Sequence, residues 1–311
     1  MGRVLVVAAT HGNERNGGWL LEGWRQDPDS LRRAGLALEL TIGNPAAWAE
    51  CRRYIDRDLN RSFDPTLLAD PARLEREVLR ARELVELYGP EGRSPCPVAL
   101  DLHSTTAAMG NSLVVYGRRS TDLALAAGLQ QQLGLPIYLH EGDPAQTGYL
   151  AERWPCGLVI EVGPVPQGVL APAIVQQTRL AFESGLGALE RAAQGSLRLP
   201  SQLVVHRHLG SLDLPRHPDG SPAAVLHPQR LGRDWQPLRP GDPLFLCRSG
   251  ETLTYEPPEA LGADPVWPVF INEAAYGEKG IALGLTRREI WPVEPLWAKD
   301  LQALCASLEA D

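Results

Sequence analysis

The chain has 311 residues, of which 44% are hydrophobic and 22% charged, and this composition excludes the fibrous and wholly disordered classes of protein. The formal net charge of −8 disfavours nucleic acids and anionic membranes as partners, so an anionic ligand would need a local cationic pocket. The five scattered cysteines form no CxxC pair, and no apolar run suits a signal peptide or a membrane span, so we expect reduced thiols and a cytoplasmic protein.

The first 195 residues alternate predicted strands with predicted helices. The clearest helix has Asp70 as its N-cap, Pro71 as its first residue and Gly89 as its stop. This alternation predicts an α/β fold, with a parallel or mixed sheet and helices on both faces. Strands are expected at residues 4–9, 36–42, 98–102, 112–116, 137–140 and 158–162, and further helices at 17–25, 121–133 and 172–193.

The pattern changes near Gly195. Beyond it, short β-type runs at residues 203–205, 223–226, 244–247 and 269–271 are separated by Pro, Gly and Asp turns, and a last helix is expected at 295–309. Together with the length of the chain, this change predicts two domains: an α/β domain of residues 1–195 and a smaller β-rich domain of residues 196–311.

Two histidines and a glutamate follow predicted buried strands. His11 and Glu14 are three residues apart in the turn after the first strand, and His103 follows the strand at residues 98–102. Ligands of α/β sheets bind at the carboxyl ends of the strands. Two His and one Glu are also the protein ligands of open, catalytic zinc sites. A turn residue and a hydrogen-bonded core histidine are the alternative, but the joint pattern favours a metal site.

Among the other histidines, His140, His217 and His227 have no carboxylate or imidazole at a clear ligand spacing, and His206 and His208 lie in the β-rich part. We expect surface or structural roles for all five. Asp101 precedes His103 by two residues. Its carboxylate could orient the imidazole ring or cap a turn.

Glu161 is the one acid in the apolar strand at residues 158–162. Burying an unpaired carboxylate is costly, so this side chain is expected to be paired or functional. In a zinc hydrolase, such a group takes a proton from the attacking water and later protonates the leaving amine. A salt bridge to an arginine is the alternative.

Residues 52–63, RRYIDRDLNRSF, alternate arginines with aspartates. Arginine pairs with carboxylates in a bidentate manner and stabilises oxyanions, so this segment could hold an acidic substrate. The alternative is a set of surface ion pairs, each contributing only about 0–1 kcal/mol.

Five segments of the chain resemble the aspartoacylase and succinylglutamate desuccinylase family, which is related to zinc carboxypeptidases. The resemblance covers nearly the whole chain. It implies a zinc-carboxypeptidase-like mixed sheet and a C-terminal β-rich domain that narrows the substrate channel. The matching segments are HGNE at 11–14, RYIDRDLNRSF at 53–63, DLHSTT at 101–106, IEVGPVPQGVL at 160–170 and VFINEAAYGEK at 269–279.

The resemblance also implies roles for individual residues. At the centre it implies one Zn²⁺ per chain with His11, Glu14 and His103 as ligands, Glu161 as general base and Arg53 as the group that polarises the carbonyl. Around the substrate it implies Asn60 and Arg61 as carboxylate contacts, Asp58 as a supporting carboxylate, Tyr276 reaching into the site, and Glu273 and Lys279 holding that segment.

The implied reaction is deacylation of an N-acyl amino acid by zinc-activated water, with N-acetyl-L-aspartate giving L-aspartate and acetate. The family's mammalian aspartoacylases carry an arginine for the second carboxylate of the substrate, whereas residues 146–151 here, QTGYLA, contain none. A related deacylase of neutral or aromatic N-acyl amino acids, or a carboxypeptidase-like enzyme, is the alternative, and a noncatalytic zinc-dependent binding protein is a third. The expected partner is a small anionic N-acyl amino acid, without nucleic acid or membrane, and homo-oligomerisation stays open.

Overall fold

A computed structural model describes residues 3–31, 35–144 and 146–306 of the chain. The first part contains β1 (Arg3–Ala8), α1 (Arg15–Gln26), β2 (Ala37–Ile42), α2 (Pro45–Glu50), α3 (Pro65–Ala69), α4 (Arg76–Tyr88), β3 (Val98–Ser104), β4 (Gly110–Tyr116), α5 (Ser120–Leu133), β5 (Ile137–His140), β6 (Cys156–Gly163) and α6 (Pro172–Ala193). The second part contains β7 (Gln202–Asp213), β8 (Ala224–Leu226), β9 (Pro243–Cys247), β10 (Thr252–Thr254), β11 (Trp267–Val269), β12 (Ile281–Pro292) and α7 (Pro295–Cys305).

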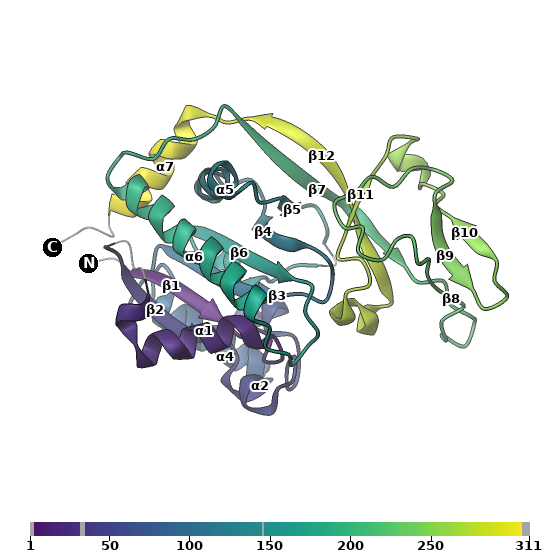
Figure 1. Ribbon diagram of the computed structural model, residues 1–311. Coiled ribbons are helices and arrows are strands. Elements are labelled where there is room, and N and C mark those ends of the chain that lie inside the picture. The colour runs from purple at the N-terminus through teal and green to yellow at the C-terminus, as the bar shows by residue number, and fades with distance from the viewer. Residues whose placement is uncertain (1–2, 32–34, 145, 307–311) are drawn as a thin grey trace.

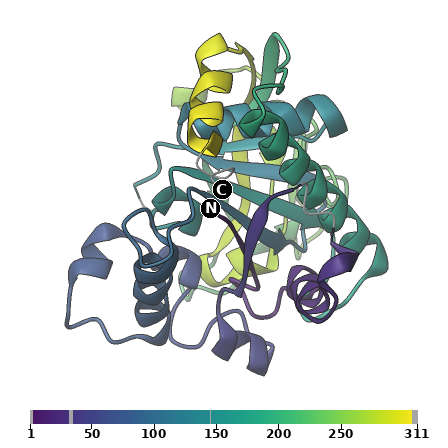
Figure 2. The ribbon, with the colours of Figure 1, turned by 90° about the vertical axis from the view of Figure 1, so that its left-hand side faces the viewer.

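Nine strands form one mixed sheet in the order β11-β12-β7-β5-β4-β6-β3-β1-β2 (Figure 1). Strands β2, β1, β3 and β6 run parallel to one another, whereas β4 pairs with β6 in the antiparallel direction. Figure 2 shows the blue helix α4 on one side of this sheet and the purple α1 and teal α6 on the other. The predicted fold class, a mixed sheet with helices on both faces, is therefore confirmed.

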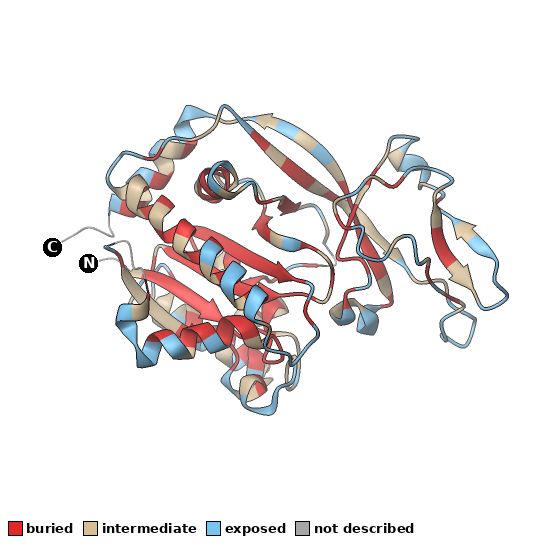
Figure 3. Ribbon diagram, viewed as in Figure 1, coloured by how far each residue is buried: buried red, intermediate tan, exposed pale blue. Residues whose placement is uncertain are grey.

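Strand β1 shows why both faces of the sheet are covered. Its residues Val4 and Val6 belong to the large core under α1, α5 and α6, whereas Leu5 and Val7 belong to a second core under α4. Side chains alternate between the faces of a strand, so a run that is apolar throughout needs cover on both. The central strands are accordingly buried along most of their length (Figure 3).

Strands β7 and β12 form a long antiparallel ribbon that belongs to two cores. At one end Leu203 and Val205 complete the large core, and at the other Leu283 and Leu285 pack in a separate core with the three-stranded sheet β10-β9-β8. Figure 1 shows this small sheet at the far end of the ribbon. The sequence analysis did not predict strand β12. The division of the chain into two domains at residue 195 stays a prediction.

The predicted start of the clearest helix is wrong. Helix α4 begins at Arg76, because Asp70 instead closes a turn in which its carboxylate accepts the backbone N–H of Ala72 at 2.9 Å. The carboxylate of Asp56 accepts the N–H of Arg76 at 2.9 Å, which satisfies a free donor at the true helix start. Leu74, expected to pack, is 69% exposed. The last predicted helix is described only as far as Cys305, since residues 307–309 lie outside the described part of the chain.

None of the helices that the structure describes combines the length and apolar character needed to cross a membrane.

Candidate functional site

Three neighbouring parallel strands bring the predicted site residues to one edge of the sheet. His11 follows the carboxyl end of β1, and His103 and Glu161 lie near the ends of β3 and β6. His103 and Glu161 are direct register partners across the β3–β6 pair. Because parallel strands end at the same edge, residues that are far apart in the sequence meet there.

The turn after β1 curls so that His11 and Glu14 point to one place. The N–H of Glu14 donates to the carbonyl of His11 at 3.1 Å, and the N–H of Gly12 donates to the carbonyl of Arg53 at 3.2 Å. A Cβ atom at Gly12 would lie 2.1 Å from the carbonyl carbon of Ala47 at the start of α2. Only glycine allows this close approach, so the residue fixes how the histidine and the glutamate are presented.

His11, Glu14 and His103 form a buried cluster. His11 Nδ1 lies 2.6 Å from Glu14 Oε1, and His103 Nδ1 lies 3.0 Å from Glu14 Oε2. None of the three residues is more than 8% exposed, and their ligand atoms all lie within 4.8 Å of one another. Two imidazole nitrogens and a carboxylate oxygen at such separations suit a single cation of the zinc class.

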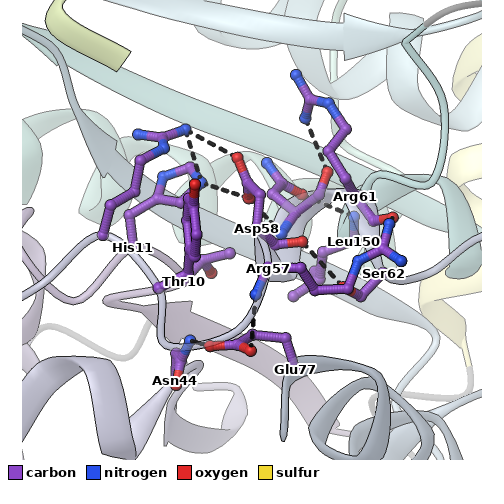
Figure 4. Close-up of polar contacts among 12 residues, drawn as sticks. Thr10, His11, Asn44, Arg57, Asp58, Arg61, Ser62, Glu77 and Leu150 are labelled. Atoms are coloured by element: carbon purple, nitrogen blue, oxygen red, sulfur yellow. Dashed lines mark hydrogen bonds and ion pairs between the residues drawn. The ribbon is translucent and has the colours of Figure 1, made fainter. Parts of the chain in front are cut away.

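The second ring nitrogen of each histidine faces a carboxylate. His11 Nε2 lies 2.9 Å from Asp58 Oδ1, which Figure 4 shows beside the ring, and His103 Nε2 lies 2.8 Å from Asp101 Oδ2. The hydroxyl of Thr10 donates to the other oxygen of Asp101 at 2.8 Å. Histidines that bind metals commonly donate their other N–H to such a carboxylate, which fixes the tautomer and the ring orientation. The surroundings of His103 therefore match a metal site, whereas His11 Nε2 also lies 2.9 Å from the donor Arg53 Nη2.

Of the four arginines at residues 52–63, Arg53 and Arg61 line the pocket beside this cluster. Arg53 donates to Glu14 Oε1 at 3.3 Å and to Asp58 Oδ2 at 3.2 Å. Arg52 is exposed, and Arg57 donates to the carbonyl of Arg61. Asp58 is not among the residues that line the pocket, but its carboxylate contacts two residues that do, His11 and Arg53.

A buried carboxylate that the sequence reasoning did not single out shapes the arginine segment. Glu77 on α4 has no exposed surface, and it accepts the backbone N–H groups of Ile55, Asp56 and Arg57 at 2.7–3.2 Å. It also accepts from Asn44 Nδ2 at 3.0 Å, a contact that Figure 4 shows below Arg57. The helical spacing of the sequence could have indicated that Glu77 is buried, because it lies on the same face of its helix as Ala81 and Leu84.

Replacing Glu77 with glutamine is expected to lower the free energy of unfolding by about 2–4 kcal/mol, because an amide cannot accept all four buried donors. Urea denaturation measures the change. Glu83→Gln, on the exposed side of the same helix, is the control and should change stability by less than about 0.5 kcal/mol. An equal effect of both substitutions would contradict this role of Glu77.

Glu161 lies in the same pocket as the cluster of His11, Glu14 and His103. Glu161 is 8% exposed, and its burial raises the pKa of its carboxyl well above the ordinary value. The nearby charge of His103 acts in the opposite direction but is the smaller effect. A carboxyl with a raised pKa next to a metal-type cluster is suited to proton transfer. The other predicted residues that line the pocket are His11, Glu14, Arg53, Asn60, Arg61, His103, Glu273 and Tyr276.

Aromatic side chains form the wall of the pocket around Arg61. The guanidinium carbon of Arg61 lies 4.0 Å from the centre of the Tyr149 ring, and Tyr149 stacks on Tyr116 at 3.9 Å between ring centroids. Asn60 is fixed close by, because its side-chain oxygen accepts the N–H of Leu150 at 2.9 Å. A cation stacked on an aromatic ring keeps its N–H donors free to point at an anion.

Glu273 connects the C-terminal segment to the loop after His103. Its Oε2 accepts hydrogen bonds from the backbone N–H of Thr106 at 2.8 Å and from the Thr106 hydroxyl at 2.9 Å. The hydroxyl of Thr105 donates to the same oxygen. Its other oxygen accepts the N–H of Ala275 at the start of a 3₁₀ helix, η5 (Ala274–Lys279). This helix carries Tyr276 into the pocket lining, whereas Lys279 is not among the lining residues.

Fold and site together define the class of the protein, an amidohydrolase with a carboxypeptidase-like mixed sheet and a His–Glu–His cluster at the strand ends. Residues 1–188 match the family described as the succinylglutamate desuccinylase/aspartoacylase catalytic domain, and residues 201–288 match the AstE/AspA barrel-sandwich hybrid domain. The chain belongs to the succinylglutamate desuccinylase/aspartoacylase family, which confirms the resemblance found in its sequence.

Relatives named "Probable aspartoacylase" are similar over almost the whole chain. Those of Prochlorococcus marinus strain MIT 9313 and Parasynechococcus marenigrum strain WH8102 are each 58% identical, over 97% of this chain and 98% of the relative. Among solved structures, murine aminoacylase 3 is 40% identical with a TM-score of 0.84, covering 94% of this chain and 97% of that one. A succinylglutamate desuccinylase of Chromobacterium violaceum, at 17% identity and a TM-score of 0.57, shares the fold.

Proposed function

We propose that the chain is a zinc-dependent amidohydrolase that removes the acyl group from N-acyl-L-amino acids, with N-acetyl-L-aspartate as its substrate. One observation carries the proposal: His11, Glu14 and His103 converge within 4.8 Å in a pocket that Glu161, Arg53 and Arg61 also line. The name of the relatives at 58% identity supports the choice of substrate. One Zn²⁺ per chain is proposed for this centre, since its donors match those of zinc sites with an open position.

A cation at this centre would acidify a water molecule and polarise the amide carbonyl. Glu161 takes the proton from the attacking water and passes it to the leaving nitrogen. Arg53 stabilises the negative charge that develops on the carbonyl oxygen. Asp58 acts through these groups, because it holds the ring of His11 and the guanidinium of Arg53.

Arg61 and Asn60 are proposed to bind the α-carboxylate of the substrate. Both line the pocket, and Arg61 supplies the local positive charge that an anion needs in a chain of net charge −8. Tyr276 would close the pocket from the C-terminal segment. The expected partner is accordingly a small anionic N-acyl amino acid.

A second candidate, deacylation of aromatic or other neutral N-acyl amino acids, is favoured by the remainder of the pocket wall. Tyr116, Tyr138, Tyr149 and Phe270 line it, and Arg53 and Arg61 are its arginines among the described residues. If both arginines serve the carbonyl and the α-carboxylate, no third one receives the β-carboxylate of aspartate.

Initial rates on a substrate panel decide between the two. For the zinc-loaded protein, we expect kcat/KM for N-acetyl-L-aspartate to exceed that for N-acetyl-L-phenylalanine and N-acetyl-L-leucine by about tenfold or more. The reverse order would assign the second candidate. Absence of amine release from every member of the panel would contradict both.

A further inference from the structure

We propose that His140, Asp143 and His208 form a second cation site, for a transition metal of the zinc class, separate from the cluster of His11, Glu14 and His103. The ligand atoms of the three side chains lie within 4.8 Å of one another. This grouping corrects the expectation that His140 has no carboxylate or imidazole at a ligand spacing. It goes beyond the proposed function, because deacylation needs one centre only.

The pairing of two strands builds the site. Strands β5 and β7 are parallel, and their register pairs Tyr138 with His206, so that His140 falls opposite His208 two residues further on. The two imidazole rings stack with their centroids 4.8 Å apart and their planes at 29°. Asp143 follows His140 by three residues, which turns its carboxylate back toward the rings.

Both imidazoles are buried, and each has one ring nitrogen without a hydrogen-bond partner among the described residues. His140 and His208 are 6% and 5% exposed, and the atoms concerned are the Nε2 nitrogens. His208 Nε2 lies 3.6 Å from Asp143 Oδ2, which is too long for a hydrogen bond. Buried polar atoms are rarely left without a partner, so these nitrogens point to a ligand.

The other side of His208 prepares it for metal binding. Its Nδ1 lies 2.9 Å from the hydroxyl of Tyr138. In the tautomer in which Nδ1–H donates to this hydroxyl oxygen, the Nε2 lone pair is left for a cation. Burial, together with the charges of His208 and Arg61, lowers the pKa of His140 to about 3. A neutral imidazole is the form that binds a metal.

The donor set selects the kind of cation. Two imidazole nitrogens and one carboxylate suit Zn²⁺ and its neighbours among the transition metals, whereas Mg²⁺ and Ca²⁺ prefer oxygen ligands. Three protein ligands also leave a position for water or for a ligand atom. Of the three residues, His140 also lines the pocket of His11, Glu14 and His103, whereas Asp143 and His208 do not.

A hydrogen-bonded path links this site to the substrate arginine. Gln146 donates to Asp143 Oδ2 at 3.1 Å, and its side-chain oxygen accepts from Arg61 Nη2 at 3.4 Å. A cation bound to Asp143 would therefore hold Gln146 in place, and with it the hydrogen-bond partner of Arg61. We infer a positioning role for this second site rather than a part in bond cleavage.

Zinc content tests the proposal. After equilibrium dialysis of the full chain against buffered Zn²⁺, mass spectrometry of the metal should find one equivalent fewer in His208→Asn and in Asp143→Asn than in the unmodified protein. The asparagine at position 208 places an amide near the position of Nδ1, so it keeps a partner for Tyr138 while removing Nε2. His206→Asn, another buried histidine of β7 outside the cluster, is the control and should keep the full content.

Equal zinc content in the unmodified protein and both site variants would overturn the proposal. Circular dichroism checks that each variant is folded. If His208→Asn does not fold, the zinc content of Asp143→Asn still tests the proposal. The result is independent of the proposed function, since a substitution at Glu14 reports on the other centre. A protein without deacylase activity could still lose one equivalent of zinc in His208→Asn.

Discussion

Glu161→Gln is expected to lower kcat by about 10²–10⁴-fold while zinc content remains that of the unmodified protein. Glutamine fills the same space at the end of β6 but cannot take a proton from the attacking water. The residue faces the pocket without belonging to the His–Glu–His cluster, so metal binding should survive. Steady-state rates on the best substrate of the panel, combined with metal analysis, measure the two quantities separately.

Glu183→Gln is the matched control for this experiment. Its carboxylate pairs with Arg179 on helix α6, outside the residues that line the pocket, and the same change of charge there should leave kcat within about twofold. A kcat for Glu161→Gln within tenfold of the unmodified enzyme would remove Glu161 from the role of base.

Glu14→Gln, unlike Glu161→Gln, is expected to weaken zinc binding. Glu14 is central to the cluster, with one oxygen near each histidine, so an amide in its place removes the negative charge that two imidazoles and a cation share. Zinc content should fall by one equivalent. Activity should fall by about 10³-fold or more, which corresponds to the several kcal/mol that a catalytic metal supplies.

The two glutamate variants are best read together. Glu161→Gln should keep the zinc content of the unmodified protein but lose activity, whereas Glu14→Gln should lose both activity and one equivalent of zinc. If Glu14→Gln kept as many zinc equivalents as the unmodified protein, the cluster of His11, Glu14 and His103 would not be a metal centre. Restoration of activity by a large excess of Zn²⁺ in Glu14→Gln alone would support weakened binding as the cause.

The edge of the sheet could be predicted because its signals are local. Two of the three predicted strands are followed by a candidate ligand, His11 or His103, and the third carries Glu161 as its one acid. Parallel strands end together, so the meeting of these residues followed from the sequence. The structure brings all of them into one pocket with Arg53 and Arg61. Their chemical roles stay predictions for the experiments above.

Features that depend on long-range pairing were not predictable in this way. His140 and His208 meet only because β5 pairs with β7, and nothing near either histidine indicates the register. Strand β12 escaped notice because its first half is buried on both faces, whereas its second half alternates half-buried and exposed residues, so no single period runs through it. Which arginines of residues 52–63 face the pocket also depends on a distant residue, Glu77.

The ribbon of β7 and β12 has a consequence for biosynthesis. The large core that underlies the strand ends is completed by Leu203 on β7 and by Trp297 and Leu301 on α7, on either side of the small sheet. A ribosome must therefore translate the whole small sheet and α7 before the apolar faces of α5 and α6 are covered. Nascent chains paused before α7 would expose these faces, which makes them the natural targets of chaperones and of quality-control proteases.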